Sequence, residues 1–371
     1  MNRRALLRRS LDLAGMAALA EFARGAGGFE EKAQKPLKTF GSPCGLRIGG
    51  QSDIGPLKVP AYAQLIGDNF NLLTPGNQLK WGYLRPTPDA FAFTDADWMI
   101  QFAIDNGMAV HGHNLCWNST GKSWLDSVLT AGNARDYLTQ HIHTVVSRYR
   151  GKIDSWDVVN EPVAPWSRRS DGLYPGIWLN LLGPEYIDIA FSATAAADPG
   201  TLRVLNIHHV EHDTADDARN RQSAMALIHS LLQRRVPIQA VGIESHLTAG
   251  VPLAGANLTK LIRDIRNSGL EVLITELDVD DTQIAGDDRT RDAVVAKWYS
   301  DYITLVIPES SAHSLIFFTP CDRWNWLDGA HETHFKRADG QRHRPGLFDG
   351  NLTPKMAFQS AESAITAVCR H

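Results

Sequence analysis

Charged residues are scarce in this 371-residue chain, at 21% of the sequence, and the formal net charge is only −4. Such a balance gives no general attraction to nucleic acid or to acidic membrane surfaces, so neither is expected as a partner. The chain also lacks low-complexity tracts and repeats of fixed sequence, while 43% of its residues are hydrophobic. We therefore expect a globular protein with a large core, built as one domain rather than two.

Cysteine is equally scarce. The four cysteines are Cys44, Cys116, Cys321 and Cys369, and no two of them have C-x-x-C spacing. Because that spacing is absent, the sequence gives no support for a zinc knuckle or a thioredoxin-type motif. Cys44 and Cys369 lie near the two ends of the mature chain, so they could form a disulfide if the fold brings its termini together. Buried free thiols are the alternative.

No hydrophobic run approaches the roughly 20 residues that a membrane span needs. The first twenty residues nevertheless differ from the rest, because the basic MNRRALLRRS precedes the weakly apolar LDLAGMAALA, with a small-residue pattern at 18–20. This is typical of an export signal, and Arg8-Arg9-Ser10-Leu11 resembles a twin-arginine signal. We expect an exported protein, periplasmic or secreted, with a leader over residues 21–40. An amphipathic N-terminal helix or a single membrane anchor is the alternative.

Short apolar runs alternate with longer segments of helical period along the remaining chain. Eight such runs imply a parallel sheet, and eight is the number that closes a (β/α)₈ barrel, or TIM barrel. We therefore predict an α/β fold with one such barrel over residues 41–371. The expected strands are residues 46–50, 71–74, 109–113, 155–160, 203–206, 240–245, 272–276 and 314–318.

Polar and aromatic residues follow nearly every expected strand. Barrel enzymes place their chemistry at the carboxyl ends of the strands, where such residues would converge. Sugars need many hydrogen-bonding partners and aromatic planes against their C–H faces, so this pattern favours a sugar site.

Two glutamates at strand ends suit glycoside hydrolysis. WDVVNEP, residues 156–162, leads outward to Glu161, and LITELDV, residues 273–279, contains Glu276. The fourth and seventh strands lie on opposite sides of an eight-stranded barrel, so the two carboxyls can face each other across a sugar. We expect Glu161 to be the acid/base and Glu276 the nucleophile. Alternatively, either glutamate alone could cap a helix or pair with an arginine.

The chain resembles glycoside hydrolase family 10, whose best-known members are retaining endo-β-1,4-xylanases. The resemblance covers roughly residues 44–365, and its motifs occur in the family's order and approximate spacing. They are NFNLLTPGNQLKW, FAFTDADWMIQFAIDNGMAVHGHNLCW, WDVVNEP, VGIESHL, ITELDV and GLFDGNLTPKMAF.

This resemblance implies a role for each matching residue. Glu161 and Glu276 would stand about 5 to 5.5 Å apart and act with retention. Asn160 would bind the sugar's 2-hydroxyl, while His246, oriented by Asp278, would support the nucleophile. The remaining matches, placed on the glycone side, are Asn77, Lys80, His113, Trp117 and Trp326. No cofactor or metal is implied.

Four departures from the family lie in the expected site. Gly76 replaces a sugar-binding glutamate, which suggests that the space is open to a uronic acid or arabinose substituent. Glu244 replaces a glutamine and adds a third carboxyl, so at least one pKa should rise and the pH optimum should differ from that of a Glu244→Gln variant. The other two departures are His208-His209 in place of a segment containing tyrosine, and Phe318 in place of tryptophan.

Two histidine-containing segments leave alternatives open. HHVEHD, residues 208–213, offers metal-ligating groups, but its spacing fits no helical H-E-x-x-H site, so no metal is predicted. HETHFKRADGQRHR, residues 331–344, is either a solvated loop or a contact for acidic decorations on glucuronoxylan, through Lys336, Arg337 and Arg342.

The expected function is hydrolysis of β-1,4-xylosidic bonds in xylan or decorated xylan by a monomer whose partner is a polysaccharide or oligosaccharide. The alternatives are hydrolysis of another plant β-glycan or glycoside, and sugar binding without catalysis on the same scaffold. The retained set of Glu161, Glu276, His246 and Asp278 favours catalysis, because binding alone needs no proton donor and nucleophile.

Overall fold

Parallel strands close into a barrel in the part of the chain that this computed structural model describes, residues 34–119, 124–164, 166–310 and 312–370. β1 pairs with β2 on one side and with β10 on the other, and β10 also pairs with β9, which completes the ring. The strands are β1 (Arg47–Ser52), β2 (Leu72–Pro75), β3 (Ala109–Gly112), β5 (Ser155–Asn160), β6 (Leu202–Ile207), β7 (Ala240–Ile243), β9 (Glu271–Asp280) and β10 (Ser314–Phe317), with the short β4 (Cys116–Trp117) and β8 (His246–Thr248).

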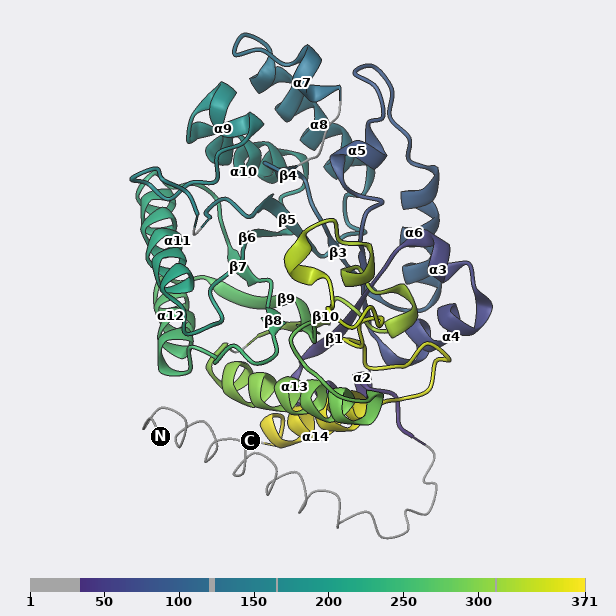
Figure 1. The fold of residues 1–371 in the computed structure, drawn as a ribbon. Helices are drawn as coiled ribbons and strands as arrows, with labels where there is room; N and C mark the ends of the chain where they lie inside the picture. Colours follow the sequence, from purple (N-terminus) through teal and green to yellow (C-terminus); the bar gives the residue numbers. More distant parts are fainter. Residues whose placement is uncertain (1–33, 120–123, 165, 311, 371) are drawn as a thin grey trace, which may run out of the picture. The chain divides into compact units, whose positions relative to one another are not determined.

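Helices surround the strands in Figure 1. This alternation of strand and helix confirms the predicted (β/α)₈ barrel. The helices are α2 (Lys38–Gly41), α3 (Ile54–Leu57), α4 (Pro60–Asn69), α5 (Trp81–Leu84), α6 (Thr94–Asp105), α7 (Leu125–Val128), α8 (Ala134–Arg148), α9 (Ile177–Leu182), α10 (Glu185–Ala197), α11 (Ala215–Gln233), α12 (Ala256–Asn267), α13 (Asp288–Ser310) and α14 (Met356–Val368), with short 3₁₀ segments at Ser42–Cys44, Asp322–Trp324, Leu327–Gly329 and Thr333–Phe335.

The core forms where the helices cover the barrel. In α8, Leu138, Ile142 and Val145 recur at helical spacing and are fully buried, so one face of the helix packs inward. The strands are buried on both faces, as in β5, where all six residues are buried. This two-sided burial holds the strand ends, and therefore the side chains that follow them, in fixed positions.

A disulfide joins Cys44 to Cys369, which is the pairing that the sequence left open. The bond connects the segment after α2 to the end of α14, and α2 and α14 are in contact. Cys116 and Cys321 are free and buried.

The compact unit begins at Pro36. The predicted export signal, residues 1–20, lies outside the described residues. Among the described residues, no helix has the combination of length and hydrophobicity that crossing a membrane requires.

Candidate active site

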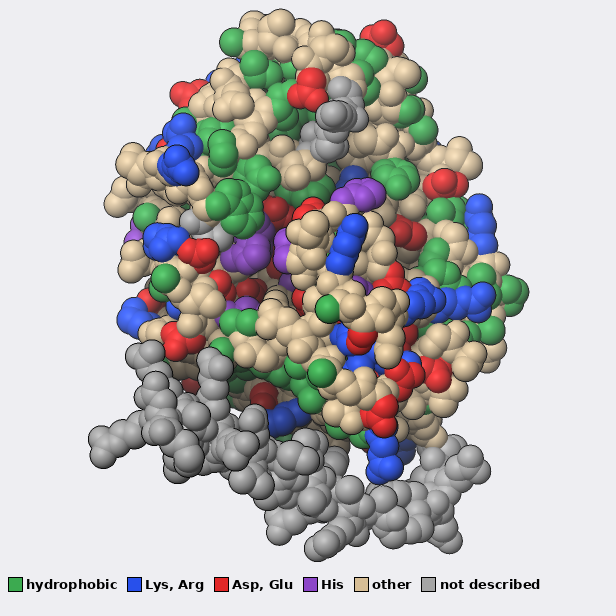
Figure 2. All heavy atoms as spheres, in the orientation of Figure 1, with side chains coloured by type: hydrophobic (Ala, Val, Ile, Leu, Met, Phe, Trp, Pro, Cys, Tyr) green, Lys and Arg blue, Asp and Glu red, His purple; other side chains and the backbone are tan. Residues whose placement is uncertain are grey.

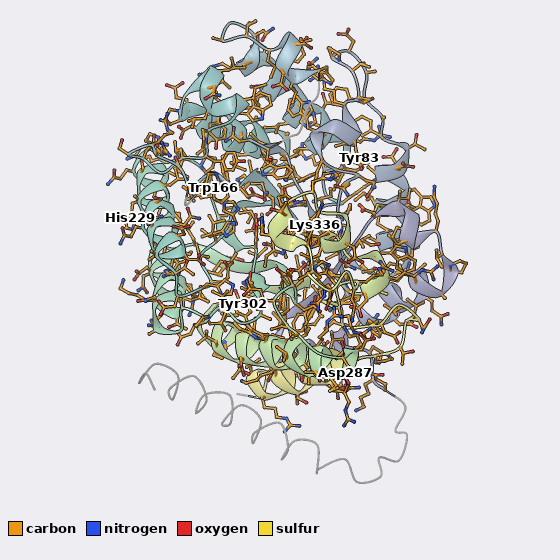
Figure 3. All side chains as sticks on the ribbon, viewed as in Figure 1. Tyr83, Trp166, His229, Asp287, Tyr302 and Lys336 are labelled. Atoms are coloured by element: carbon orange, nitrogen blue, oxygen red, sulfur yellow. A yellow bond between two sulfur atoms is a disulfide. The ribbon has the colours of Figure 1, made fainter. Side chains whose placement is uncertain are left out.

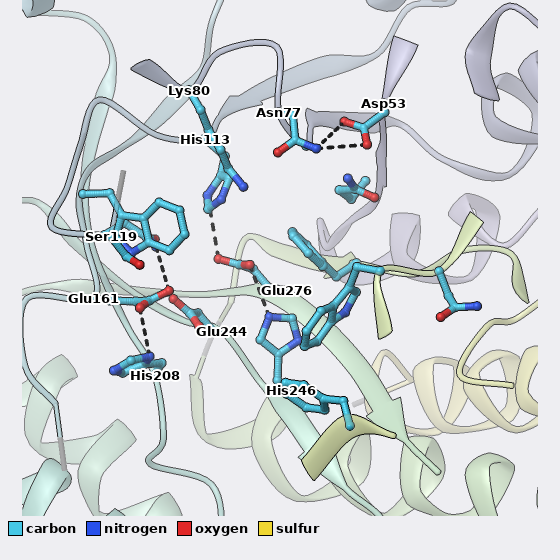
Figure 4. A pocket seen from close by; sticks show the side chains of 18 of the residues that line it. Asp53, Asn77, Lys80, His113, Ser119, Glu161, His208, Glu244, His246 and Glu276 are labelled. Carbon is cyan, nitrogen blue, oxygen red and sulfur yellow. Dashed lines mark hydrogen bonds and ion pairs between the residues drawn. The ribbon is translucent and has the colours of Figure 1, made fainter. Parts of the chain in front are cut away.

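A cavity of about 940 Å³ opens at the carboxyl ends of the strands. Both expected catalytic glutamates line it, together with histidines and tryptophans from several strand ends. Figure 2 shows histidine and acidic side chains gathered around a hollow in this face. The close-up in Figure 4 shows Glu161, Glu244 and Glu276 at its centre.

The backbone places both glutamates at the barrel mouth. Glu161 follows the last residue of β5, has a φ of 49°, and donates its N–H to the Asn206 carbonyl at 2.9 Å. A non-glycine residue in this left-handed region is conformationally costly, and such residues concentrate at functional sites. Glu276 lies within β9 and donates its N–H to the Glu244 carbonyl at 2.9 Å.

Glu276 is held as a carboxylate. Burial by itself would raise its pKa, but the charges of His113, His246 and Lys80 and a hydrogen bond with His246 lower the pKa to about 2. His246 Nε2 lies 3.4 Å from one carboxylate oxygen, and His113 Nδ1 lies 3.7 Å from the other. Figure 4 shows the carboxylate between these two rings.

His246 is a cation between two carboxylates. Its Nδ1 lies 2.7 Å from Asp278, on the side opposite Glu276. Burial disfavours the charged ring, but the charge of Asp278 and hydrogen bonds to Asp278 and Glu276 raise the pKa of His246 well above its ordinary value. The second oxygen of Asp278 accepts hydrogen bonds from Thr319 at 2.9 Å and from the Trp326 indole at 2.6 Å. Asp278 therefore has little freedom to move, and it fixes the ring beside Glu276.

Glu161 has the opposite protonation preference. Burial raises its pKa, and the charge of Glu276 raises it further, while the nearby Trp117 indole offsets part of the rise. One oxygen accepts a 3.3 Å hydrogen bond from Asn160, and the other lies 3.4 Å from His208 Nδ1. Burial lowers the pKa of His208 to about 4, so this ring is neutral and does not favour ionisation of Glu161. Glu161 can thus remain protonated at a pH at which Glu276 is ionised.

The predicted third carboxyl, Glu244, lies beside both glutamates. It is 3% exposed and has potential ligand atoms within 4.8 Å of those of Glu161 and, separately, of Glu276. Burial raises its pKa well above the ordinary value, and the charges of Glu276 and Glu161 add to the rise. The pKa of both Glu161 and Glu244 is therefore raised.

Asn206 was not predicted as a site residue, although it connects three that were. Its fully buried side-chain amide donates to Glu276 at 2.7 Å and to Asn160 at 2.8 Å, and it lies 3.4 Å from Glu244. Thr275 Oγ1 in turn donates to the side-chain oxygen Oδ1 of Asn206 at 2.7 Å, which fixes the orientation of the amide. The signal available in the sequence was its position at a strand end, where β6 places it in register with Asn160.

Asp157 is a second buried residue that the sequence analysis did not assign. One of its oxygens lies 2.9 Å from His113 Nδ1 and 2.9 Å from His111 Nε2. Burial opposes its charge, but the charge and hydrogen bond of His111 and the hydrogen bond of His113 lower the pKa of Asp157. This contact holds the His113 ring beside Glu276.

The space at Gly76 is occupied, contrary to the expectation that it is open to a sugar substituent. A Cβ at Gly76 would lie 1.7 Å from Gln51 Nε2 and 3.1 Å from Asp53 Oδ1. Asp53 also accepts hydrogen bonds from Asn77 at 3.0 and 3.1 Å. The Gln51 amide therefore fills part of the volume expected to be vacant, and sequence reasoning missed it because Gln51 lies on the neighbouring strand.

The other predicted binding residues also line the cavity. Lys80 Nζ lies 5.3 Å from the centroid of the Trp117 ring, in a cation–π arrangement. Phe318 and Trp326 each have a ring centroid 5.1 Å from that of His246, so they form an aromatic wall beside it. His209 lies next to His208, with ring centroids 4.6 Å apart.

Trp166 adds an aromatic surface that the sequence analysis did not predict. It lines the cavity, is 53% exposed, and packs edge to face against His208, His209 and Tyr174. Figure 3 labels it. An exposed indole that packs against His208, itself 3.4 Å from Glu161, is suited to contact a sugar ring in the cavity.

The basic segment 331–344, expected to be either a solvated loop or a contact for acidic decorations, engages Arg337 and Arg342 within the fold and leaves Lys336 exposed. Arg337 is buried and donates to the carbonyl of Ile284 at 3.0 Å, while also pairing with Asp339. Arg342 pairs with Asp328 at 2.6 Å. Only Lys336 among the three proposed contacts is exposed without an ion pair in the described structure. Two of the three cations are thus already engaged within the fold.

The arrangement combines a carboxyl with a raised pKa, a carboxylate with a pKa near 2, a cation that supports the carboxylate, and aromatic walls. Proton donation and nucleophilic attack need carboxyls of these two kinds. The site is therefore equipped for acid-assisted substitution at the anomeric carbon of a bound sugar.

Comparisons with known proteins agree with this chemistry. The chain is 31% identical over 297 residues to endo-1,4-beta-xylanase C of Phanerodontia chrysosporium, covering 79% of this chain and 70% of that protein. It is 30% identical to a beta-1,4-xylanase of Dictyoglomus thermophilum, covering 82% and 85%. The crystal structure of native xylanase 10B from Thermotoga maritima superposes with a TM-score of 0.80 at 25% identity, covering 90% of this chain and 99% of that one. Because the model of glycosyl hydrolase family 10 also matches residues 37–364, the chain belongs to that family.

Proposed function

We propose that the protein is a retaining glycosidase that cleaves β-1,4-xylosidic bonds in xylan or decorated xylan. The observation that carries this proposal is the pair of buried carboxyls, Glu161 after the end of β5 and Glu276 within β9, one with a raised and one with a lowered pKa. Two relatives that support the choice of xylan are the xylanases of P. chrysosporium and D. thermophilum. A similar structure, xylanase 10B from Thermotoga petrophila, was determined in complex with xylobiose.

The reaction begins with attack by Glu276 on the anomeric carbon while Glu161 protonates the departing oxygen. The ester formed at Glu276 carries no negative charge. Because that charge contributes to the raised pKa of Glu161, the pKa of Glu161 falls in the intermediate. Glu161 can then take a proton from water, which attacks the same face and releases the sugar with its original configuration. One change of charge thus converts the acid of the first step into the base of the second.

Labelling by a mechanism-based inactivator tests this function. A 2-fluoro xylobioside with a good leaving group should inactivate the enzyme, and digestion should locate the modified residue at Glu276. A Glu276→Gln variant is the control and should remain unlabelled. Absence of labelling by xylosyl reagents, combined with labelling by glucosyl reagents, would support another β-glycan. Absence of labelling by both would support sugar binding without catalysis.

We also propose that the protein is exported and acts as a monomer. The basic and weakly apolar residues 1–20 support export, and so does the Cys44–Cys369 disulfide, because such bonds persist in oxidising compartments. Deleting residues 1–20 should leave the protein in the cytoplasm, as cell fractionation would measure. Light scattering at micromolar concentration should give a mass near 40.9 kDa or slightly less after signal removal.

A further inference from the structure

Two of the departures from the family meet in space beside the acid/base. His208 follows β6 and Glu244 follows β7, and each has a potential ligand atom within 4.8 Å of one on Glu161 and of one another. Figure 4 shows the three side chains together. Both Glu244 and His208 are buried, at 3% and 6% exposure. We propose that Glu161, His208 and Glu244 form a binding site for a divalent transition-metal ion such as Zn²⁺, which inhibits the enzyme when bound.

The hydrogen bond of His208 leaves the correct nitrogen available for a metal. Its Nε2 lies 2.9 Å from the Val163 carbonyl oxygen, which can only accept, so Nε2 carries the hydrogen. The lone pair is therefore on Nδ1, the atom that lies 3.4 Å from Glu161 Oε2. Histidines that bind metals commonly donate their other N–H to a carbonyl or carboxylate in this way. The ring is consequently oriented as a ligand before any ion arrives.

The Glu244 carboxyl has few partners for a buried group. Its contact with the Asn206 amide is long, at 3.4 Å, and no shorter hydrogen bond to this carboxyl occurs among the described residues. Ionised Glu161 and Glu244 would repel one another, and neutral His208 would not relieve the repulsion. A divalent cation would relieve it, because it attracts both carboxylates.

Three other groups of potential ligands within the described residues are less suitable. In the group that contains His246, both ring nitrogens already face carboxylates, at 2.7 and 3.4 Å, and the ring is a cation without a lone pair to offer. In the group that contains His113, the Nδ1 atom of that ring is already hydrogen-bonded to Asp157 at 2.9 Å. In the group that contains Asp281, that carboxylate already pairs with Arg291 and Arg337.

One nitrogen and two carboxylate oxygens suit zinc, which binds nitrogen and oxygen ligands at about 2.0 to 2.2 Å and commonly keeps water as a fourth ligand. Donor atoms around such an ion stand roughly 3.4 Å apart, so the three side chains would have to close from at most 4.8 Å. The cavity supplies an entry path and room for water. Bound Zn²⁺ would occupy the carboxyl that must donate the proton, which explains why we expect inhibition.

Isothermal titration of ZnCl₂ into the whole protein at pH 7.5, in buffer free of chelators, tests the site. Wild-type protein should bind one ion per chain at this site, and Glu244→Gln should weaken binding by roughly 100-fold or more, since losing even an outer partner of a ligand costs about 10- to 100-fold. His209→Asn is the matched control, because His209 is adjacent but lies outside the site, and it should bind Zn²⁺ as wild type does. Affinity should rise with pH, because binding displaces protons from the carboxyls.

Equal affinity of the wild type and Glu244→Gln for Zn²⁺, or no binding by the wild type, would overturn the proposal. Thermal denaturation checks that Glu244→Gln is folded, and His208→Gln provides a second variant that should also lose the site. Zn²⁺ should further inhibit xylan hydrolysis, and a chelator should reverse the inhibition. That part alone rests on the proposed function, so a protein without xylanase activity would still give a decisive binding result.

Discussion

Replacing His246 by glutamine should shift the acidic side of the pH–activity profile upward. In the wild type, the ionised form of Glu276 persists down to about pH 2, the pKa that its environment imposes. Burial alone would raise that pKa, and cations lower it, so removing a cation raises it. His246 is one of these cations, with Nε2 3.4 Å from Glu276. Activity that requires ionised Glu276 should therefore be lost at a higher pH in the variant.

The size of the shift follows from the interaction removed. A hydrogen bond to a charged group contributes about 1.5 to 3 kcal/mol, and one pKa unit corresponds to about 1.36 kcal/mol. Loss of His246 should thus raise the pKa of Glu276 by roughly one to two units. The shift is partial because His113, Lys80 and the Asn206 amide remain beside the carboxylate.

The assay is the pH dependence of kcat/KM between pH 2.5 and 7 for an aryl β-xylobioside. A phenolate with a low pKa leaves without help from Glu161, so this substrate isolates the ionisation of Glu276. Fluorescence at each pH verifies that the protein remains folded. Trp326→Phe is the control, because it removes a donor to Asp278 while keeping the imidazolium, and its shift should be smaller. The wild-type profile should stay nearly flat down to pH 2.5, and an equally flat profile for His246→Gln would refute the reasoning.

Three further predictions concern other parts of the molecule. Gly76→Glu should raise KM, because its Cβ would meet Gln51 Nε2 at 1.7 Å. Adding Gln51→Ser should restore KM toward the wild-type value. If the effects of the two single substitutions on KM simply add in the double variant, the prediction is wrong. Cys369→Ser should lower the free energy of unfolding by roughly 2–5 kcal/mol in urea titrations with kcat unchanged, since the disulfide closes a long loop away from the site. Asn206→Asp should reduce kcat by roughly 10- to 100-fold, because it replaces a 2.7 Å donor to Glu276 with a negative charge, and a kcat within twofold of wild type would exclude the role.

The sequence predicted the barrel because the relevant signals are local. Apolar runs of strand length alternate with helical periods such as that of α8, and the count of eight limits the topology to a closed barrel. The general rule that barrel chemistry lies at the carboxyl ends of strands then selected Glu161 and Glu276. The pairing of Cys44 with Cys369 remained open, because whether two distant segments come together depends on how the terminal helices pack.

Contacts between residues on different strands were harder to predict. The sequence assigned no role to Asn206, since an asparagine at a strand end resembles many others until its amide is seen 2.7 Å from Glu276. It interpreted Gly76 as open space, whereas a glutamine on the adjacent strand occupies that space. It also left open whether Arg337 and Arg342 lie in a solvated loop or contact acidic decorations, and both are engaged with acidic residues or carbonyls within the fold.

The amino-acid sequence by itself predicted the fold class and the two carboxyls, because periodicity and short motifs are properties of neighbouring residues, while the resemblance to glycoside hydrolase family 10 implied the residues that support them. Only the tertiary structure decided which carboxyl holds its proton, what fills the space beside Gly76, and that His208 and Glu244 meet next to Glu161. The physical reason is that pKa values and side-chain volumes depend on burial and on atoms a few ångströms away, which closure of the barrel brings together from distant parts of the chain.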